Sequence, residues 1–165
     1  MVLLLKNLAF TLIVPGTVGV YLPLLIVGQG ALVGGAQRLA ALALLAIGAA
    51  IYDWCVWDFA TFGRGTPAPI DAPRRLVVRG LYRFTRNPIY LGVLTVISGW
   101  AALYAAPAVL LYAAVVAAMF HSFVMLSEEP QLRARFGAEY DAYCVRVPRW
   151  LPRLPKRPRP DPGGV

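Results

Sequence analysis

The sequence has few of the residues on which disulfide-bonded and metal-binding proteins depend. Its 165 residues include two cysteines and one histidine. Cys55 lies within an apolar segment and Cys144 in a basic C-terminal region, so the two are not expected to meet in an oxidising compartment. No cysteine and histidine spacing resembles a structural zinc site. The sequence therefore predicts neither a disulfide nor a bound metal.

Charged residues are also scarce. They make up 15% of the chain, whereas hydrophobic residues make up 59% and the mean hydropathy is +0.63. This composition is too apolar for a soluble domain, and the length is too short for two domains. We expect a single integral-membrane domain over residues 1–152, followed by a basic, proline-rich, disordered tail over residues 153–165.

Four apolar segments approach the roughly 20 residues that cross a bilayer as a helix. They are Leu8 to Val27, Leu39 to Phe59, Ile89 to Ala106 and Pro107 to Leu126. The first is longer than the apolar part of a usual signal peptide, so we expect it to be retained. The expected fold is all-α and polytopic, with about four transmembrane helices, of which the third and fourth form a helical hairpin.

The basic residues are unevenly distributed among the connections. The net charge of +8 is concentrated between Phe59 and Ile89 and after Leu126, whereas the connection from Gly28 to Arg38 is nearly uncharged. The positive-inside rule then places both termini in the cytoplasm, with anionic lipid headgroups as partners. Nothing resembles a basic recognition helix or an aromatic-studded soluble sheet, so no nucleic acid partner is expected.

The third apolar segment begins with residues suited to a helix start. Asn87 is a good N-cap and Pro88 suits the first helical position. In a purely structural interpretation, Tyr90 is an interfacial aromatic and Gly92 a helix-packing contact. Arg86 opposes the helix dipole at a cost of about 0.3–1 kcal/mol, which a bound anion would remove. The segment can therefore also cradle a carboxylate or phosphate.

The fourth apolar segment ends with two acidic residues. Glu128 and Glu129 lie near a helix C-terminus, where carboxylates are disfavoured, so a cation is expected nearby. Adjacent helical residues point about 100° apart, so one glutamate can pair with an arginine while the other faces a cavity. Pro130 is expected to end this helix. The structural alternative is a solvated acidic helix end.

An amphipathic pattern follows Pro130. Leu132, Phe136, Tyr140 and Tyr143 recur at spacings of 4, 4 and 3, which predicts one apolar stripe of a C-terminal helix lying on the membrane interface. The default role of this stripe is packing, although an aromatic ring beside a sulfonium would add cation–π attraction. Tyr140 is therefore a candidate substrate-binding residue.

Three polar residues lie inside the apolar segments. Asp58 is expected at the interface, whereas Asp53 lies more than one turn deeper and is expected to pair with a loop arginine or to contact a cationic substrate. His121 precedes Glu128 by seven residues and so lies on nearly the same helical face, where it either packs or lines a cavity. Asp53 and His121 are therefore further candidate substrate-binding residues.

Several of these elements occur together in a recognisable order. They are Gly80-Leu81-Tyr82-Arg83, Arg86-Asn87-Pro88-Ile89-Tyr90-Leu91-Gly92, Glu128-Glu129, Phe136-Gly137, Tyr140, Tyr143 and Val147-Pro148-Arg149. Over residues 77–152 the chain resembles the isoprenylcysteine carboxyl methyltransferase and phospholipid methyltransferase superfamily. The resemblance implies a membrane enzyme that uses S-adenosylmethionine to methylate a lipid or lipid-like acceptor at the cytoplasmic face.

The resemblance also implies roles for particular residues. Cofactor binding is implied for Arg86, Asn87, Pro88, Tyr90, Gly92, Glu128 and Glu129. Catalytic roles are implied for Arg86, Glu128 and Glu129. Asn87 stands where the family usually has histidine, so we assign it no acid or base role.

The sequence leaves several alternatives open. The acceptor is a carboxylate or an amine, and only an amine has to lose a proton, for which Glu128 or Glu129 is the nearest base. A non-catalytic membrane scaffold or lipid-binding protein would use the same helices, and a membrane reductase would need NADPH. The richness in alanine, glycine and arginine indicates a bacterial inner membrane. The oligomeric state is not predicted.

Overall fold

The computed structural model describes residues 2–63 and 75–152, with side chains from residue 8 onward. This part of the chain is helical and contains no strand. The predicted tail over residues 153–165 and the Gly- and Pro-rich connection over residues 64–74 lie outside the described residues.

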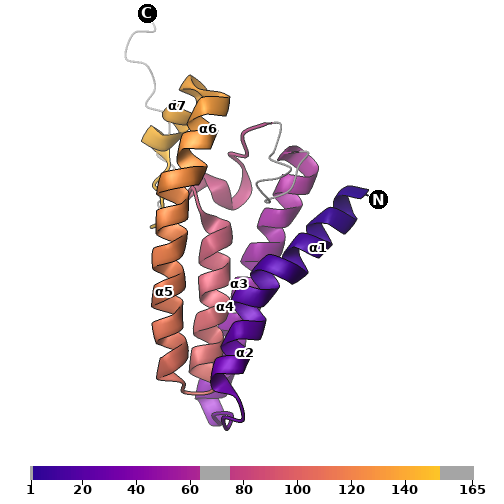
Figure 1. The fold of residues 1–165 in the computed structure, drawn as a ribbon, viewed down its shortest axis with the longest axis vertical. Coiled ribbons are helices and arrows are strands. Elements are labelled where there is room, and N and C mark those ends of the chain that lie inside the picture. The colour runs from indigo at the N-terminus through magenta and orange to yellow at the C-terminus, as the bar shows by residue number, and fades with distance from the viewer. Residues whose placement is uncertain (1, 64–74, 153–165) are drawn as a thin grey trace, which may run out of the picture.

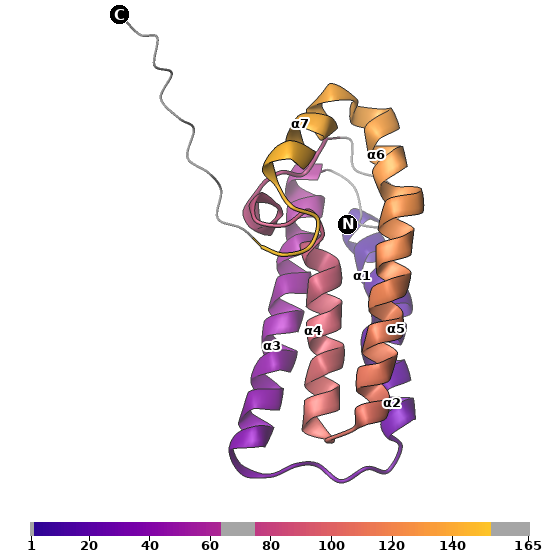
Figure 2. The same ribbon diagram turned by 90° about the vertical axis from the view of Figure 1, so that its left-hand side faces the viewer.

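The described helices form an elongated bundle, with two short helices at one end (Figures 1 and 2). The elements are α1 (Val2–Gly16), the π-helical turn η1 (Thr17–Tyr21), α2 (Leu22–Val27), α3 (Gly35–Asp58), the π-helical turn η2 (Phe59–Gly63), the 3-10 helix η4 (Gly80–Arg83), α4 (Pro88–Leu103), α5 (Pro107–Phe123), the π-helical turn η5 (Val124–Glu128), α6 (Glu129–Phe136) and α7 (Ala138–Arg146). The helices α4 and α5 form the expected hairpin, and α4 packs chiefly against α3.

Three continuous helical segments are long and apolar enough to cross a membrane: Leu8–Val27, Gly35–Gly63 and Pro107–Phe136. The third predicted segment forms α4, which has 16 residues and spans only about 24 Å. That length is short of the roughly 30 Å hydrocarbon core. Leu25, Leu39 and Leu111 are at least 70% exposed on the outer faces of the bundle. Such exposure of large apolar side chains fits contact with lipid.

Glycines allow α3 and α4 to approach very closely. A Cβ atom at Gly48 would lie 2.7 Å from the Gly92 carbonyl oxygen, and one at Gly99 would lie 2.8 Å from Leu45 Cγ. Small residues permit this backbone contact between membrane helices. We call the contact at Gly48, Gly92 and Gly99 the α3–α4 seam. Gly92 therefore occupies a packing position, and the seam fixes the helix that carries Tyr90.

The π-helical turn η1 ties the first helix to α4 and α5. Pro23 has no backbone N–H, so the Gly19 carbonyl lacks its usual helical partner. The Trp100 indole donates a hydrogen bond to this carbonyl at 3.1 Å, and the Tyr112 hydroxyl donates to the Val18 carbonyl at 2.8 Å. The irregular turn thus supplies acceptors for side chains from the two neighbouring helices.

The prediction that Pro130 ends the fourth apolar helix is wrong. The turn η5 changes the hydrogen-bond register just before Pro130, and the helix continues as α6 to Phe136. A π-helical turn absorbs the missing N–H and the ring of the proline. The helix ends instead at Gly137, which has a φ of +51°. The predicted C-terminal helix is consequently divided into α6 and α7.

The aromatic stripe packs against protein. Tyr140 and Tyr143 are 2% and 4% exposed, and they form a core cluster with Leu76 and Val147. The default expectation that this stripe packs is confirmed. Its burial places the cluster next to the segment that precedes α4, where several of the predicted site residues lie.

Candidate functional site

Glu129 is the centre of an ion-pair cluster. It is 8% exposed at the start of α6. Arg149 donates from Nε to Oε1 at 2.7 Å and from Nη2 to Oε2 at 2.9 Å, while Arg86 Nη1 lies 3.1 Å from Oε1. The hydrogen bond to Glu129 raises the pKa of the Arg149 guanidinium. We call these three residues the basic cluster, because two guanidinium groups face one carboxylate and leave a net positive charge.

Arg86 is fixed in this cluster but keeps an unused donor. Its Nη1 also donates to Cys144 Sγ at 2.7 Å, and its backbone N–H donates to the Pro148 carbonyl at 2.9 Å. Its side chain is 12% exposed. Within the described part of the chain, its buried Nε has no hydrogen-bond partner. A buried donor without a partner costs free energy, so the cluster is suited to accept a further anionic group.

Asn87 does not cap α4 with its side chain. No side-chain capping hydrogen bond is present. Instead, Asn87 Nδ2 and Thr85 Oγ1 each donate to the Arg149 carbonyl at 3.0 Å. The C-terminal segment brings the Arg149 carbonyl close to Asn87. The Asn87 side chain is oriented toward this carbonyl and not toward the free N–H groups at the start of α4. Asn87 therefore occupies the predicted N-cap position but makes no side-chain capping hydrogen bond, and Pro88 begins α4 as predicted.

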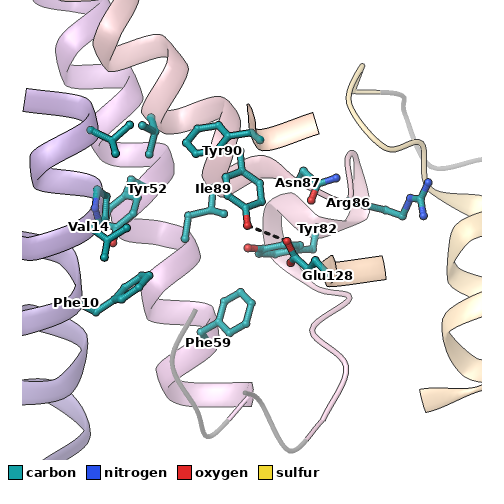
Figure 3. Close-up of a pocket in the computed structure, with 14 residues that line it drawn as sticks. Phe10, Val14, Tyr52, Phe59, Tyr82, Arg86, Asn87, Ile89, Tyr90 and Glu128 are labelled. Atoms are coloured by element: carbon teal, nitrogen blue, oxygen red, sulfur yellow. Dashed lines mark hydrogen bonds between the residues drawn. The ribbon is translucent and has the colours of Figure 1, made fainter. Parts of the chain in front are cut away.

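Glu128 has different surroundings from its neighbour. Tyr90 Oη donates to Glu128 Oε2 at 2.8 Å (Figure 3). Among the described residues, no arginine or lysine forms an ion pair with Glu128. The Tyr90 ring packs against Phe120, with ring centroids 4.6 Å apart. One glutamate thus pairs with arginines and the other does not, as the 100° spacing predicts.

A cavity of about 790 Å³ joins these groups to an apolar wall. Its polar lining includes Tyr82, Arg86, Asn87, Tyr90, Glu128, Glu129, Tyr140 and Tyr143. Its apolar wall is contributed mainly by α1, η1 and α5, through Phe10, Val14, Val18, Val115, Met119 and Phe123. Figure 1 shows α1 leaning away from α5 toward its N-terminal end. The volume lies within the 300–1,000 Å³ usual for small-molecule sites.

Tyr82 lines this cavity, although sequence reasoning assigned it no site role. It is 6% exposed, its backbone carbonyl accepts a 2.8 Å hydrogen bond from Tyr143 Oη, and its ring meets Phe59 edge-on. Burial raises the pKa of the Tyr82 and Tyr143 phenols. The one sequence signal was its place after Gly80 in the quoted motif. Gly80 has a φ of +54°, and a Cβ atom there would clash with the Asp58 carboxylate.

The remaining candidate residues lie apart from the cavity. Asp58 is 1% exposed and pairs with Arg79 Nε at 3.0 Å, so it is buried within the protein, and its expected place at the membrane interface stays a prediction. Asp53 is exposed, and His121 is exposed and accepts a 3.0 Å hydrogen bond from Trp150 Nε1. Neither lines the cavity, and neither do Pro88 and Gly92. Of the three candidate substrate-binding residues, the structure brings only Tyr140 to the cavity.

Arg149 is the other residue that sequence reasoning did not assign to the site. It belongs to the quoted Val147-Pro148-Arg149 motif, but it follows α7 at a place that no helical periodicity relates to Glu129. No group of at least three His, Cys, Asp or Glu residues arranged to hold a metal is present in the described ranges.

Comparison with known proteins agrees with the motifs. The family model for phospholipid methyltransferases matches residues 36–139, more than half of the chain. The match begins within α3, upstream of the motif region, and includes Arg86, Glu128 and Glu129 but not Arg149. Comparisons with curated proteins and with solved structures gave no match. The chain belongs to the phospholipid methyltransferase family.

Proposed function

We propose that the protein transfers a methyl group from S-adenosylmethionine to the headgroup of a phospholipid or similar lipid at the cytoplasmic membrane face. The observation that supports this proposal is a separation of charge at the polar end of a largely apolar cavity. The basic cluster carries a net positive charge, while Glu128 is a carboxylate without an ion-pair partner among the described residues.

The donor set of the cavity fits this cofactor. The unused Nε of Arg86 would bind the methionine carboxylate, and Asn87 and Tyr140 line the same region. Glu129 is satisfied by two arginines, so its role is to hold them in position. When bound, S-adenosylmethionine supplies an electrophilic methyl group on a sulfonium. Glu128 would provide the negative charge on the cationic side of the site.

The cavity also favours one class of acceptor. The apolar wall from α1 and α5 would accommodate lipid chains. A carboxylate acceptor would be repelled by Glu128, whereas an ammonium headgroup would be attracted. The ammonium must lose a proton before it can attack, and Glu128 is placed to accept it. General base catalysis of this kind contributes about 10²–10⁴-fold.

We place the site at the cytoplasmic face, in a protein with both termini on that side. The proposal is supported by the basic residues that cluster at the site end, including Arg79, Arg86 and Arg149. The N-terminal end of α1 and the helix α7 lie in the same half of the bundle (Figure 1). Anionic headgroups are the proposed partners of this surface, and a bacterial inner membrane is the proposed location.

The first experiment measures binding of S-adenosylmethionine, S-adenosylhomocysteine and NADPH to the detergent-purified protein by calorimetry. We expect saturable binding of both adenosyl ligands, weakened in Glu128→Ala and Arg86→Ala. Glu139→Gln and Arg146→Ala are matched controls, because both residues are exposed on α7 and outside the cavity. Selective binding of NADPH would indicate a reductase. Absence of binding to all three ligands would favour a scaffold or lipid-binding protein.

A further inference from the structure

The hydroxyl of Tyr82 is a buried polar group that the proposed function leaves without a task. Tyr82 is 6% exposed, and its Oη has no hydrogen-bond partner in residues 8–63 and 75–152. The Cys55 thiol packs in the same core cluster and contributes to the raised pKa of the Tyr82 phenol, but its geometry does not make it a hydrogen-bond partner of Oη. Burying a hydroxyl without a partner is unfavourable, so a ligand atom is the natural partner.

The residue that carries this hydroxyl is held both by its backbone and by its ring. The Tyr82 carbonyl accepts from Tyr143 Oη at 2.8 Å, and the Tyr82 N–H donates to the Arg79 carbonyl at 3.0 Å. Phe59 meets the ring edge-on, with centroids 5.6 Å apart. Rotation of the side chain to find a partner elsewhere is therefore opposed by packing. The hydroxyl is fixed before any ligand binds.

The Tyr82 hydroxyl lies near the Glu128 carboxylate, which has no ion-pair partner among the described residues. Figure 3 shows the hydroxyl ends of Tyr82 and Tyr90 close to the Glu128 carboxylate. These three residues line both the large cavity and a smaller one of about 90 Å³, whose other walls are mostly apolar. Glu129, Tyr140 and Tyr143 line only the large cavity. The group formed by Tyr82, Tyr90 and Glu128 thus lies where apolar walls meet polar atoms.

We propose that Tyr82 Oη accepts a hydrogen bond from the nitrogen of the lipid amine, and so sets which amines are methylated well. The inference rests on the proposed function. Tyr90 Oη already donates to Glu128, and the Glu128 carboxylate and Tyr82 Oη are the two acceptors that we assign to the amine. An ammonium N–H passes its proton to Glu128, while a second N–H donates to Tyr82.

The bonding changes then balance. The nitrogen lone pair freed by proton transfer forms the new N–C bond, the methyl carbon–sulfur bond breaks, and its electron pair remains on sulfur. Orientation by Tyr82 directs the lone pair toward the methyl carbon, which is the positioning that in-line transfer needs. The product is an ammonium with one more methyl group and one N–H fewer, and the transferred proton leaves Glu128 for solvent.

This arrangement gives a dependence on the number of N–H bonds. A primary ammonium has three N–H groups and a monomethyl ammonium has two, so either can contact Glu128 and Tyr82 together. A dimethyl ammonium has a single N–H, which Glu128 takes. Tyr82 should therefore assist the first two acceptors and not the third.

The test compares Tyr82→Phe with the wild-type protein on detergent micelles that carry a phospholipid with an ethanolamine, N-methylethanolamine or N,N-dimethylethanolamine headgroup. We expect kcat/KM to fall about 3- to 10-fold for the first two, the scale of one lost hydrogen bond, and to stay within about twofold for the third. Affinity for S-adenosylmethionine and the thermal unfolding midpoint should not decrease. Tyr21→Phe, on an exposed ring outside both cavities, should match wild type throughout.

The outcomes separate this inference from the function on which it rests. An equal loss on all three acceptors, or no loss on any, overturns the role of Tyr82 alone. A lower unfolding midpoint in Tyr82→Phe also overturns it, because the hydroxyl would then have a structural partner. Wild-type protein that binds S-adenosylmethionine but methylates none of the three amines overturns the proposed acceptor class and this inference together.

Discussion

The α3–α4 seam and the cavity beside α1 differ in how closely their helices approach. At the seam, a single added methyl group at Gly48 would collide with the backbone of α4. Between α1 and α5, larger side chains instead surround a space of about 790 Å³. Both regions contact α4, so Gly92 on one face packs against α3 while Tyr90 points to Glu128. The contrast indicates that the tight contact provides the rigid support from which the site residues project.

Adjacent residues repeat this contrast at a smaller scale. Glu129 is tied to Arg86 and Arg149, whereas Glu128 is bound by a tyrosine hydroxyl alone among the described residues. The π-helical turn η5 ends at Glu128, and such turns are frequent at functional sites. Changes at the seam should therefore alter stability, and changes at the cavity should alter ligand binding or turnover.

The largest effect is expected from Glu128→Gln. It keeps the size of the side chain but removes the charge and the proton acceptor, so methyl transfer should fall about 10²–10⁴-fold. The unfolding midpoint should stay close to that of wild type, because Glu128 has no ion pair with the described residues. Radiolabelled methyl transfer measures the loss, with Glu139→Gln as the control. Transfer at the wild-type rate would contradict the assignment.

Gly48→Ala should break the seam. Its Cβ atom would lie 2.7 Å from both the Gly92 carbonyl oxygen and the Val96 nitrogen, so α3 and α4 must separate. We expect a loss of about 1–3 kcal/mol in unfolding free energy, read as a lower midpoint of thermal unfolding in detergent. Gly34→Ala is the matched control, because Gly34 has a φ of −107° and no atom near its Cβ position. Equal midpoints for the two variants would refute the seam.

Arg149→Ala should weaken the basic cluster without removing Arg86. Glu129 would lose its two-point partner but keep Arg86, and the cluster would lose its net positive charge. Because Glu129 is buried but keeps Arg86 as a partner, we expect a loss of about 1–3 kcal/mol in unfolding free energy, together with weaker binding of S-adenosylmethionine. Calorimetry and thermal unfolding measure the two effects. The exposed Arg146→Ala provides the comparison, and similar behaviour of both variants would argue against the cluster.

The smallest effect is expected from Met119→Trp, which places a larger side chain in the apolar wall and so narrows the cavity. Met119 lines the cavity on α5, whereas Leu111 on the same helix is 70% exposed and does not. We expect the KM for a long-chain lipid acceptor to rise by up to about tenfold, with the affinity for S-adenosylmethionine unchanged. Leu111→Trp should leave both unchanged. If Met119→Trp and Leu111→Trp have the same KM for the lipid acceptor, the wall formed by α1 and α5 is not the lipid site.

Much of the fold could be predicted from apolar length alone, but its irregular turns could not. The first apolar segment is helical through to Val27 as predicted, although its helix already begins at Val2, and the hairpin forms as α4 and α5. The count of four membrane helices is not confirmed, because α4 has only 16 residues. The prediction that the helix ends at Pro130 failed because a proline usually interrupts a helix, whereas here a π-helical turn before Pro130 allows the helix to continue.

The candidate residues that lie in contiguous motifs come together at one cavity, whereas contacts between distant segments were not predicted. Arg86, Tyr90, Glu128 and Glu129 were identified from two short motifs, and they line one cavity. Their cofactor and catalytic roles stay predictions. Asp53 and His121 were chosen by helical position, but that position does not reveal which face a neighbouring helix covers. Both are exposed outside the cavity.

The sequence by itself determined that this is a membrane protein of the phospholipid methyltransferase family, because apolar length and ordered short motifs are local properties. Only the tertiary structure decided that Arg149 binds Glu129, that Asp58 is buried against Arg79, and that Tyr82 faces Glu128. These relations join residues 20 to 46 positions apart through packing of separate elements. No helical or strand period extends over such distances, so the contacts depend on how the elements pack in three dimensions.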